Sequence, residues 1–457
     1  MVSGEGTFEA TSLRDSLCGT LSVADIGRTV RVCGWVGRRR EHGEHLAFVD
    51  LRDHSGLLQC VIDGSVDVRS EYVLQITGTV RHRPEGTVND KLATGEIELG
   101  DCSVEILGVA EPPPFGLDDR SDVDEQIRLR FRFLDLRRPR LQHNLRVRAA
   151  VNRAVRAAMD AQGFVEVETP ILWAPTPEGA REFAVPSRLH HGSFYVLPQS
   201  PQLAKQLLMV GGLDRYYQIA RCMRDEDLRA DRQFEFTQLD LEASFVTQDD
   251  VLAFVSEAVL AASEAATGTR PGPIPTLTWH EAMDRFGSDK PDLRVAVELT
   301  DLSALFDGSE VKAFAAPVVK ALRLEGAGET PRSQLDAWTE KAKSLGAAGL
   351  AWFRVTADGL DSPLVKFLSE EEATGIQSQT GSVPGDLVLM VASDWRTASE
   401  VLGHLRAQLL SPPVGDGQMA YLWVVDFPMF DGTDAQGNPA AAHHPVSYTH
   451  LRAHETS

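Results

Sequence analysis

The residues best suited to chemistry surround one predicted turn, within residues 219–242. Four charged side chains that surround the turn are Arg224, Glu226, Arg229 and Arg232. After the turn, Gln238, Asp240 and Glu242 follow at a spacing of two, which places all three on one face of a strand. An arginine beside such a face suits two-pronged capture of a phosphate or carboxylate. The pattern predicts a face that binds a charged ligand, and the alternative is an exposed hairpin with a solvated ion-pair face.

The elements that must position these residues follow from hydrophobic periodicity. Alternating runs at residues 216–221 and 234–245 predict a long antiparallel hairpin. A strand is expected at 164–170, where Pro170 ends it. Helices are expected at about 143–162 and 249–266. The first of these has an apolar stripe made of Ala150, Val151, Ala154, Val155, Ala158 and Met159, and Gly163 follows as its terminator.

The first hundred residues predict short strands and turns only. The expected strands are residues 30–36, 46–51, 57–62, 72–80 and 96–107. Five strands of this length suggest a small Greek-key barrel of the OB type, a fold that binds oligonucleotides across one face. Arg38, Arg39 and Arg40 supply positive charge there, and Phe48 supplies an aromatic ring. A solvated charge cluster beside a core phenylalanine is the alternative interpretation.

A proline-rich break at residues 111–115 predicts a linker after this barrel. Residues 298–410 are rich in Ala, Leu and Val, show mixed helix and strand signals, and contain no cluster of catalytic residue types. We therefore expect a domain inserted into the middle one. The predicted divisions are 1–110 (barrel), 111–140 (hinge), 141–295 (core), 296–412 (inserted domain), 413–445 (core resumed) and 446–457 (tail).

Composition excludes several classes of protein. The net charge of −21 argues against a surface generally coated for nucleic-acid binding, although one basic groove remains compatible with it. The five cysteines are widely spaced and odd in number, which predicts a reducing compartment. No apolar run approaches the length of a membrane span, and the N-terminus lacks the pattern of a signal peptide. The expected location is the cytoplasm.

Five collinear segments resemble the bacterial aspartyl-tRNA synthetase family, of subclass IIb. GFVEVETP at 163–170 resembles class II motif 1, and MRDEDLRADRQ at 223–233 resembles motif 2. PQSPQLAKQ at 198–206 resembles the aspartate-binding segment. GSDKPDLR at 287–294 and AHHP at 442–445 resemble the segments that flank an inserted GAD-type domain. The resemblance implies an α+β multidomain fold, with an OB-fold barrel, a class II antiparallel-sheet core and an inserted α/β GAD-type domain.

The resemblance also implies roles for individual residues. The implied aspartate-binding residues are Glu178, Ser200, Gln202, Lys205, Arg224, Asp240, His443 and His444. Within this set, Lys205 would pair with the substrate's side-chain carboxylate, and Gln202 and Asp240 would bind its ammonium. The implied ATP-binding residues are Arg224, Asp225, Glu226, Gln233 and Phe236, with the Phe236 ring stacked on adenine. ATP with Mg²⁺ is the implied co-substrate, and no tightly bound prosthetic group is implied.

The implied partners are tRNA-Asp, L-aspartate, ATP and a second copy of the chain, with no membrane. In the barrel, Phe48 would stack on an anticodon base, while Arg40 and Gln59 would contact base edges. Members that charge only tRNA-Asp tend to have Leu where this chain has His42 and Lys where it has Gly86. His42 with Gly86 therefore resembles the non-discriminating type, which also aspartylates tRNA-Asn.

The pattern of the family stops after Pro445. The stretch expected next would carry the Mg²⁺ ligands and motif 3, so no metal ligand is assigned within this chain. Residues 446–457 resemble no part of the family and look like a translated artefact. We therefore expect the 457-residue polypeptide itself to be inactive in ATP–pyrophosphate exchange and unable to complete its catalytic sheet.

Several alternatives remain open at this stage. An enzyme that charges only tRNA-Asp is one, and a sister synthetase for asparagine or lysine is another, against which Gln202, Lys205 and the inserted domain count. An asparagine synthetase built on the same core would lack the barrel. From a different class, a truncated chain could serve as an inactive tRNA-binding or regulatory protein.

Overall fold

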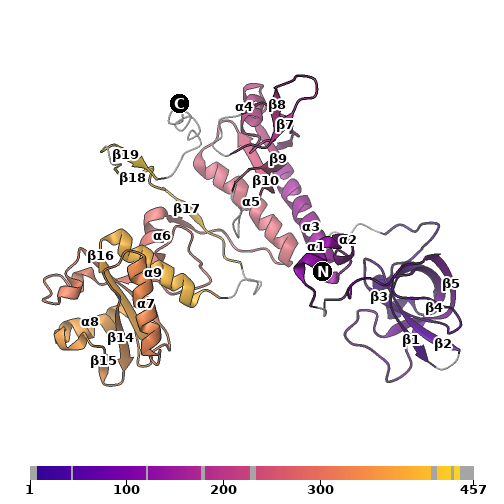
Figure 1. Ribbon diagram of the computed structural model, residues 1–457, viewed down its shortest axis with the longest axis horizontal. Helices are drawn as coiled ribbons and strands as arrows, with labels where there is room; N and C mark the ends of the chain where they lie inside the picture. Colours follow the sequence, from indigo (N-terminus) through magenta and orange to yellow (C-terminus); the bar gives the residue numbers. More distant parts are fainter. Residues whose placement is uncertain are drawn as a thin grey trace. The chain divides into compact units, whose positions relative to one another are not determined.

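The computed structural model describes residues 8–42, 45–119, 122–175, 181–226, 233–412, 419–433 and 437–442 (Figure 1). Contacts between residues divide the chain into two compact units. The first unit comprises Met1–Val165 and Thr247–Arg270, and the second comprises Glu166–Val246 and Pro271–Ser457. Within the described residues, no helix is both long and apolar enough to cross a membrane.

The first unit begins with a closed five-stranded barrel of order β1-β2-β3-β5-β4. Its strands are β1 (Thr29–His42), β2 (Leu46–Arg52), β3 (Leu57–Asp63), β4 (Val73–His82) and β5 (Ile97–Gly108). Burial alternates along β1, β2 and β4, so that Val32, Val49 and Ile76 point into the core and their neighbours point out. The five predicted strands are confirmed, each within a few residues of its observed ends except β1, which runs on to His42.

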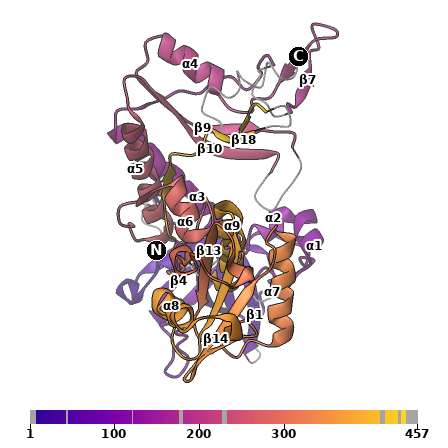
Figure 2. The ribbon, with the colours of Figure 1, turned by 90° about the vertical axis from the view of Figure 1, so that its left-hand side faces the viewer.

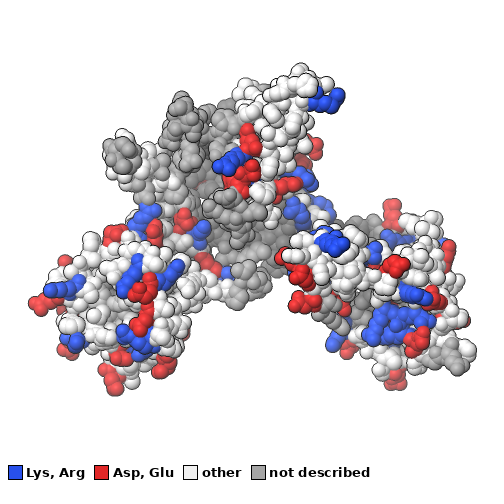
Figure 3. All heavy atoms as spheres, viewed as in Figure 1, with Lys and Arg blue, Asp and Glu red and all other residues white. Residues whose placement is uncertain are grey.

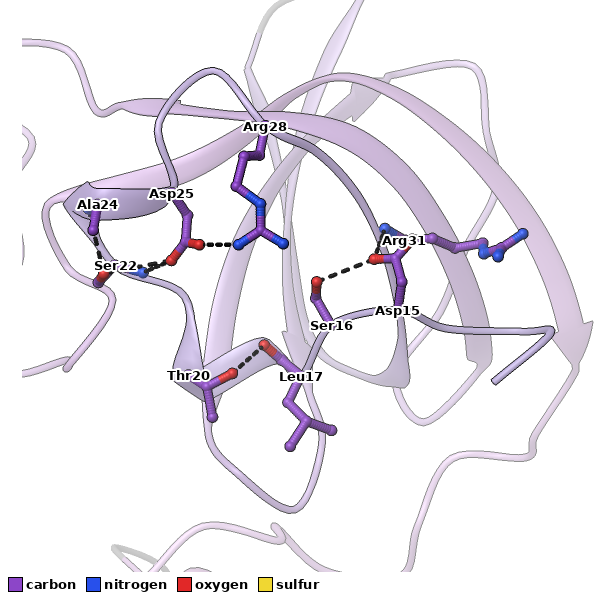
Figure 4. Close-up of polar contacts among 9 residues, drawn as sticks. All are labelled: Asp15, Ser16, Leu17, Thr20, Ser22, Ala24, Asp25, Arg28 and Arg31. Carbon is purple, nitrogen blue, oxygen red and sulfur yellow. Dashed lines mark hydrogen bonds and ion pairs between the residues drawn. The ribbon is translucent and has the colours of Figure 1, made fainter. Parts of the chain in front are cut away.

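Polar contacts hold the N-terminal segment against the barrel (Figure 4). The Asp15 carboxylate accepts hydrogen bonds from the Arg31 backbone N–H at 2.9 Å and from the Ser16 hydroxyl at 3.0 Å. Ser22 and Asp25 form a capping box around the short 3₁₀ helix Val23–Asp25, and Arg28 pairs with Asp25. The backbone N–H of Ser22 in this box is the largest cause that holds the pKa of Asp25 below its ordinary value.

Helices complete the first unit after the linker. They are α1 (Glu125–Arg130), α2 (Arg132–Asp135), α3 (Pro139–Ala161) and α5 (Gln248–Thr267). Helix α3 starts with Pro at its first position, ends before Gly163 at φ 77°, and packs along α5. The rings of Phe164, which follows α3, and Phe254 of α5 pack edge to face, with their centroids 5.1 Å apart. The predicted helices are confirmed, and α3 begins four residues earlier than expected.

The second unit contains the predicted hairpin, formed by β9 (Arg215–Met223) and β10 (Glu235–Ala243) in a sheet of order β10-β9-β6 (Figure 2). The strand expected at 164–170 is wrong in extent, because only β6 (Val165–Glu166) is regular. Beyond β6, the Val167 N–H still donates a hydrogen bond to the Tyr217 carbonyl of β9 at 3.1 Å. Pro170 has no N–H to donate to the ladder. Helix α4 (Gln202–Val210) packs on this hairpin. Shorter pairs are β7 (Ala184–Pro186) with β8 (Phe194–Val196), and β18 (Phe430–Thr433) with β19 (Pro439–Ala441).

The region predicted to be inserted has a five-stranded sheet of order β12-β13-β16-β14-β15. Its strands are β12 (Leu299–Asp301), β13 (Val318–Leu324), β14 (Ala351–Thr356), β15 (Gly359–Asp361) and β16 (Leu387–Ser393). Helices α7 (Arg332–Ser344) and α9 (Trp395–Leu410) cover one face, and α8 (Glu370–Thr380) covers the other. The alternation of Leu387, Val388 and Leu389 between the two cores shows this directly.

Helix α6 (Trp279–Phe286) is fixed to this sheet through α9. Gly287 and Gly403 approach so closely that a Cβ atom on either would overlap the other's backbone. The Asp284 carboxylate accepts from the buried Lys320 ammonium and, at 2.8 Å, from the Trp395 indole N–H. Strand β11 (Thr276–Thr278) pairs in parallel with β17 (Trp423–Val425), which lies in the segment predicted to resume the core.

Candidate functional site

The hairpin presents the predicted residues on one face. Phe236, Gln238 and Asp240 alternate along β10, and their partners across the ladder are Cys222, Ala220 and Gln218 on β9. Cross-strand partners share a face of the sheet. Arg224 continues this face beyond the end of β9, and its guanidinium carbon lies 5.1 Å from the centre of the Phe236 ring. The structure therefore arranges these side chains in a line along the strand, as the spacing of two predicts.

The innermost part of the face is a cluster of charges around Lys205 of α4. The Lys205 ammonium donates to Asp240 Oδ1 at 3.0 Å and to the Leu241 carbonyl at 3.2 Å, and lies 3.3 Å from Glu242 Oε2. Gln238 Nε2 also donates to Asp240 Oδ1, at 3.3 Å. The side chain of Asp240 is only 6% exposed and that of Lys205 12%. A buried ammonium and carboxylate of this kind can each take a ligand group of opposite charge.

Three polar atoms of the hairpin and of α4 are buried without a hydrogen-bond partner among the described residues. They are Arg224 Nε, Gln202 Nε2 and Asp240 Oδ2. Leaving a buried donor or acceptor unsatisfied costs about 1–3 kcal/mol. Two of the three are donors and one is an acceptor, which matches a ligand that carries both carboxylates and an ammonium. These atoms therefore fit the amino-acid and phosphate groups that the sequence predicts.

Hydrogen bonds fix the backbone around the face. The Gln218 carbonyl oxygen Oε1 accepts from the Tyr216 hydroxyl at 2.9 Å and from the Thr169 hydroxyl at 2.9 Å, which joins the segment after β6 to β9. The Met223 N–H donates to the Pro198 carbonyl at 2.9 Å, which ties the 198–206 segment to the end of the hairpin. Burial, with a smaller contribution from the charge of Asp240, raises the pKa of Tyr216, so that its hydroxyl stays protonated as a donor.

The remaining predicted site residues of the core lie beside the hairpin loop, at the start of α4, or outside the described residues. Asp225, Glu226 and Gln233 lie beside the loop of the hairpin, where Asp225 N–H donates to the Arg181 carbonyl at 3.0 Å. The hydroxyl of Ser200 accepts from the Gln202 N–H at 3.3 Å at the start of α4. Other predicted residues lie outside the described residues, namely Glu178, Arg229, Arg232, His443 and His444.

A second set of predicted residues meets on the outer face of the barrel. Arg40 donates to Asp50 at 2.7 Å and to Gln59 Oε1 at 3.1 Å, and its guanidinium lies 6.0 Å from the centre of the Phe48 ring. The His42 ring meets the same phenylalanine edge to face at 5.7 Å. Phe48 is half-buried on this outer face, whereas its neighbours Ala47 and Val49 lie in the core. The interpretation of Phe48 as a core residue is therefore wrong.

Three residues that extend this outer face, Arg81, Arg83 and Glu98, carry no signal in the sequence that singles them out. Gln59 Nε2 donates to Glu98 Oε2 at 2.8 Å, and Arg81 Nε donates to Glu98 Oε1 at 3.0 Å. Arg83 Nε donates to the Ile97 carbonyl at 2.9 Å, while its Nη2 is buried and has no partner among the described residues. Burial lowers the pKa of Arg83. Glu98 falls at a buried position of β5, so only the pairing of β5 beside β3 could have revealed it.

Gly86 follows β4 in a turn and has φ 78°, with open space around the position of a Cβ atom. A side chain there would meet no neighbour but would be held in a left-handed conformation that L residues rarely adopt. Lys and Arg side chains gather on the visible face of the barrel, with acidic side chains among them (Figure 3). The barrel thus carries local positive charge on a chain whose net charge is −21.

A broad groove of about 830 Å³ lies elsewhere, between α7 and α9, and is lined by residues such as Trp338, Lys341 and His404. It contains none of the predicted site residues. Among the described residues, no group of three or more His, Cys, Asp and Glu side chains could hold a metal ion.

Comparison with known proteins matches two parts of the chain to families. A family model described as "tRNA synthetases class II (D, K and N)" matches residues 124–456, and one described as "OB-fold nucleic acid binding domain" matches residues 30–107. A curated relative from Halothermothrix orenii, named Aspartate--tRNA(Asp/Asn) ligase, is 46% identical over 450 residues, which cover 95% of this chain and 76% of the relative. A relative of the same name from Micrococcus luteus is 49% identical over 435 residues, or 92% of this chain and 72% of the relative.

Solved structures share the fold at lower identity. The asparaginyl-tRNA synthetase of Pyrococcus horikoshii, complexed with asparaginyl-adenylate, aligns with a TM-score of 0.51 and 18% identity. The alignment covers 86% of this chain and 95% of that one. At this identity the likeness concerns the fold alone.

Proposed function

The chain belongs to the class II tRNA synthetases of the D, K and N group, and we propose that it is an aspartate–tRNA ligase. The proposal is that it activates L-aspartate with ATP and transfers the aspartyl group to tRNA. The observation that carries it is the Lys205–Asp240 pair at the inner end of the hairpin face, together with two buried donors, Gln202 Nε2 and Arg224 Nε, that have no hydrogen-bond partner among the described residues. The names of relatives that align with 92–95% of the chain support the same substrate.

The two charges at the inner end suit aspartate. Its side-chain carboxylate would pair with Lys205, and its ammonium would pair with Asp240 and Gln202. Asparagine would offer Lys205 no carboxylate of its own, and lysine would place a second ammonium beside it. A site with a dedicated partner for each substrate group can reject an analogue that lacks one by a factor of about 10⁴.

The outer end of the face suits ATP. Phe236 lies four residues from Asp240, or about 13 Å along an extended strand, which is the scale of an aminoacyl-adenylate. The adenine would stack on Phe236, with Asp225, Glu226 and Gln233 at the loop beside it. The Arg224 guanidinium would lie between the α-phosphate and the aspartate α-carboxylate, where it offsets the repulsion of two anions. Mg²⁺ would accompany ATP and neutralise its phosphates.

The proposed reaction has two steps, and neither uses a covalent enzyme intermediate. The aspartate α-carboxylate attacks the α-phosphorus of ATP, a carboxylate–phosphorus bond forms, and pyrophosphate leaves. A terminal ribose hydroxyl of tRNA then attacks the activated carbonyl, and AMP leaves. The residues on the face contribute by positioning the reactants and balancing charge.

Titration calorimetry with L-aspartate, L-asparagine and L-lysine tests the choice of amino acid. We expect heat of binding with L-aspartate, and affinities for the other two that are lower by about a thousandfold or more. Binding of asparagine or lysine as tight as that of aspartate would refute the proposal in favour of a sister specificity.

The barrel face is the proposed contact for the anticodon. Phe48 would stack on one base, and Arg40 and Gln59 would contact base edges. Arg83 Nη2, buried and unpaired among the described residues, and Glu98 add a donor and an acceptor to the same face. His42 and Gly86 support acceptance of tRNA-Asn as well as tRNA-Asp. Purified tRNA-Asn that binds at least tenfold more weakly than tRNA-Asp would argue for the tRNA-Asp-only alternative.

Two further features belong to this proposal. A homodimer would form through the motif 1 elements, and the exposure of Leu145 on α3 (49%) and Val165 on β6 (48%) supports it. Multi-angle light scattering should give twice the mass of the chain. The cytoplasm is the proposed location, since all five cysteines are free and tRNA is the proposed partner.

A further inference from the structure

The Lys205 ammonium already has as many acceptors as it has protons. An ammonium carries three N–H groups. Its three oxygen neighbours are Asp240 Oδ1 at 3.0 Å, the Leu241 carbonyl at 3.2 Å and Glu242 Oε2 at 3.3 Å. A substrate carboxylate can therefore reach Lys205 only when one of these acceptors gives up its place.

The three acceptors differ in how easily they can leave. The Leu241 carbonyl belongs to the backbone of β10, where Leu241 is paired with Tyr217. The Asp240 side chain is 6% exposed and also accepts from Gln238. The Glu242 side chain is 29% exposed and makes the longest of the three contacts. Only Glu242 can move into water without leaving a buried group unpaired, since a released carboxylate at the surface is rehydrated.

We propose that Glu242 is an internal competitor of the substrate: in the empty site its carboxylate occupies the place on Lys205 that the aspartate side chain takes. This inference rests on the proposed function, in which Lys205 receives that side chain. Binding exchanges one carboxylate for another, so the charge around the ammonium stays constant and no bond is made or broken. Glu242 keeps Lys205 paired when substrate is absent, and it weakens aspartate binding as a result.

The competitor role predicts the direction of a mutational effect. A residue that merely positions Lys205 should weaken aspartate binding when it is altered. A competitor should strengthen binding, because the substrate no longer displaces a charged partner. The contact is partly exposed, and ion pairs of this kind contribute modestly, so we expect Glu242→Gln to lower the Kd for L-aspartate by about three- to fivefold.

The experiment is titration calorimetry of the full chain with L-aspartate, using Glu242→Gln, Glu242→Ala and a matched control. Glu235→Gln is the control, because Glu235 lies on the same strand, faces the opposite side and pairs with Arg221 at 3.1 Å. Both Glu242 variants should bind more tightly than the wild type, and the control should be unchanged. Unfolding midpoints of all three variants show whether each is folded.

The outcomes separate this inference from the function on which it rests. Unchanged or weaker binding in folded Glu242 variants, with normal binding in the wild type, would overturn the competitor role and leave the proposed function intact. A gain of the same size in Glu235→Gln would also overturn it, because the effect would then be one of general charge. A wild-type chain that binds no L-aspartate would overturn both proposals.

Discussion

Replacing Lys205 by methionine should separate two roles of this side chain. One is to bind the substrate carboxylate, and the other is to neutralise the buried charge of Asp240. Methionine keeps the apolar stem and removes the ammonium. Aspartate then loses one charge-assisted hydrogen bond, worth about 1.5–3 kcal/mol, so its Kd should rise about 10- to 150-fold. The variant also leaves the Asp240 carboxylate, 6% exposed, with Gln238 as its remaining donor in the cluster.

That unpaired carboxylate should also destabilise the fold. Removing one partner of a buried ion pair costs about 3 kcal/mol, because the other charge stays buried. The double variant Lys205→Met with Asp240→Asn removes this charge and should recover at least half of the lost stability, while aspartate binding stays lost. Urea unfolding and titration calorimetry on the same samples measure the two effects separately.

Two results would refute this reasoning. One is a single variant whose Kd for aspartate stays within threefold of the wild-type value, which would show that Lys205 does not contact the substrate. The other is a double variant that is no more stable than the single one, which would show that Asp240 is not the source of the destabilisation.

Further predictions concern the barrel and the helix α6 junction. Phe48→Ala should weaken binding of an anticodon stem–loop, measured by fluorescence anisotropy, by about 1–3 kcal/mol, the worth of one stacked base. Gly86→Lys should lower the stability of the barrel in thermal unfolding by about 1 kcal/mol, because φ is 78° there and a side chain is strained in that conformation. Combined with His42→Leu, the same change should shift binding toward tRNA-Asp. Asp284→Asn should destabilise the chain at neutral pH and lose this effect in acid. Burial opposes the charge of Asp284, but hydrogen bonds from Lys320 and Trp395 outweigh it and hold the pKa of Asp284 below its ordinary value, so its stabilising contribution is present above about pH 4 and lost as pH falls below that.

Each of these predictions has a contradicting result. Unchanged stem–loop binding by Phe48→Ala would remove the barrel face from the proposed anticodon contact. If the His42 and Gly86 variants keep the wild-type preference between the two tRNAs, these positions do not select the tRNA. A stability difference for Asp284→Asn that does not shrink as pH falls below about 4 would show that the carboxylate charge is not its source.

Hydrophobic periodicity predicted the regular elements well, because the alternation of buried and exposed positions along a helix or strand follows directly from the spacing of apolar residues in the sequence. The hairpin, the barrel strands and α3 all follow apolar alternation or an apolar stripe. The strand expected at 164–170 failed because alternation continues past the point where hydrogen bonding stops. Val167 makes one ladder bond to Tyr217, after which Pro170 contributes no donor. Periodicity records which face is buried, but it does not record where the neighbouring strand ends.

The sequence predicted which residues belong to the candidate site, but not which of their side chains contact one another. A spacing of two places Gln238, Asp240 and Glu242 on one face, as observed. Nothing in that spacing shows that Lys205, 35 residues from Asp240, occupies the centre of the cluster. The Gln59–Glu98 bond in the barrel is similarly distant in sequence. Such pairs depend on how elements pack, and packing is set by the whole core rather than by a local pattern.

The most direct test of the central claim is equilibrium binding of non-hydrolysable adenylate analogues to the chain. Aspartyl- and asparaginyl-adenylate analogues share every group except the side-chain carboxylate. We expect the aspartyl analogue to bind at least about a hundredfold more tightly, and Lys205→Met to remove most of this preference. Equal binding of the two analogues, or a preference that survives in the Lys205 variant, would contradict aspartate recognition at the hairpin face.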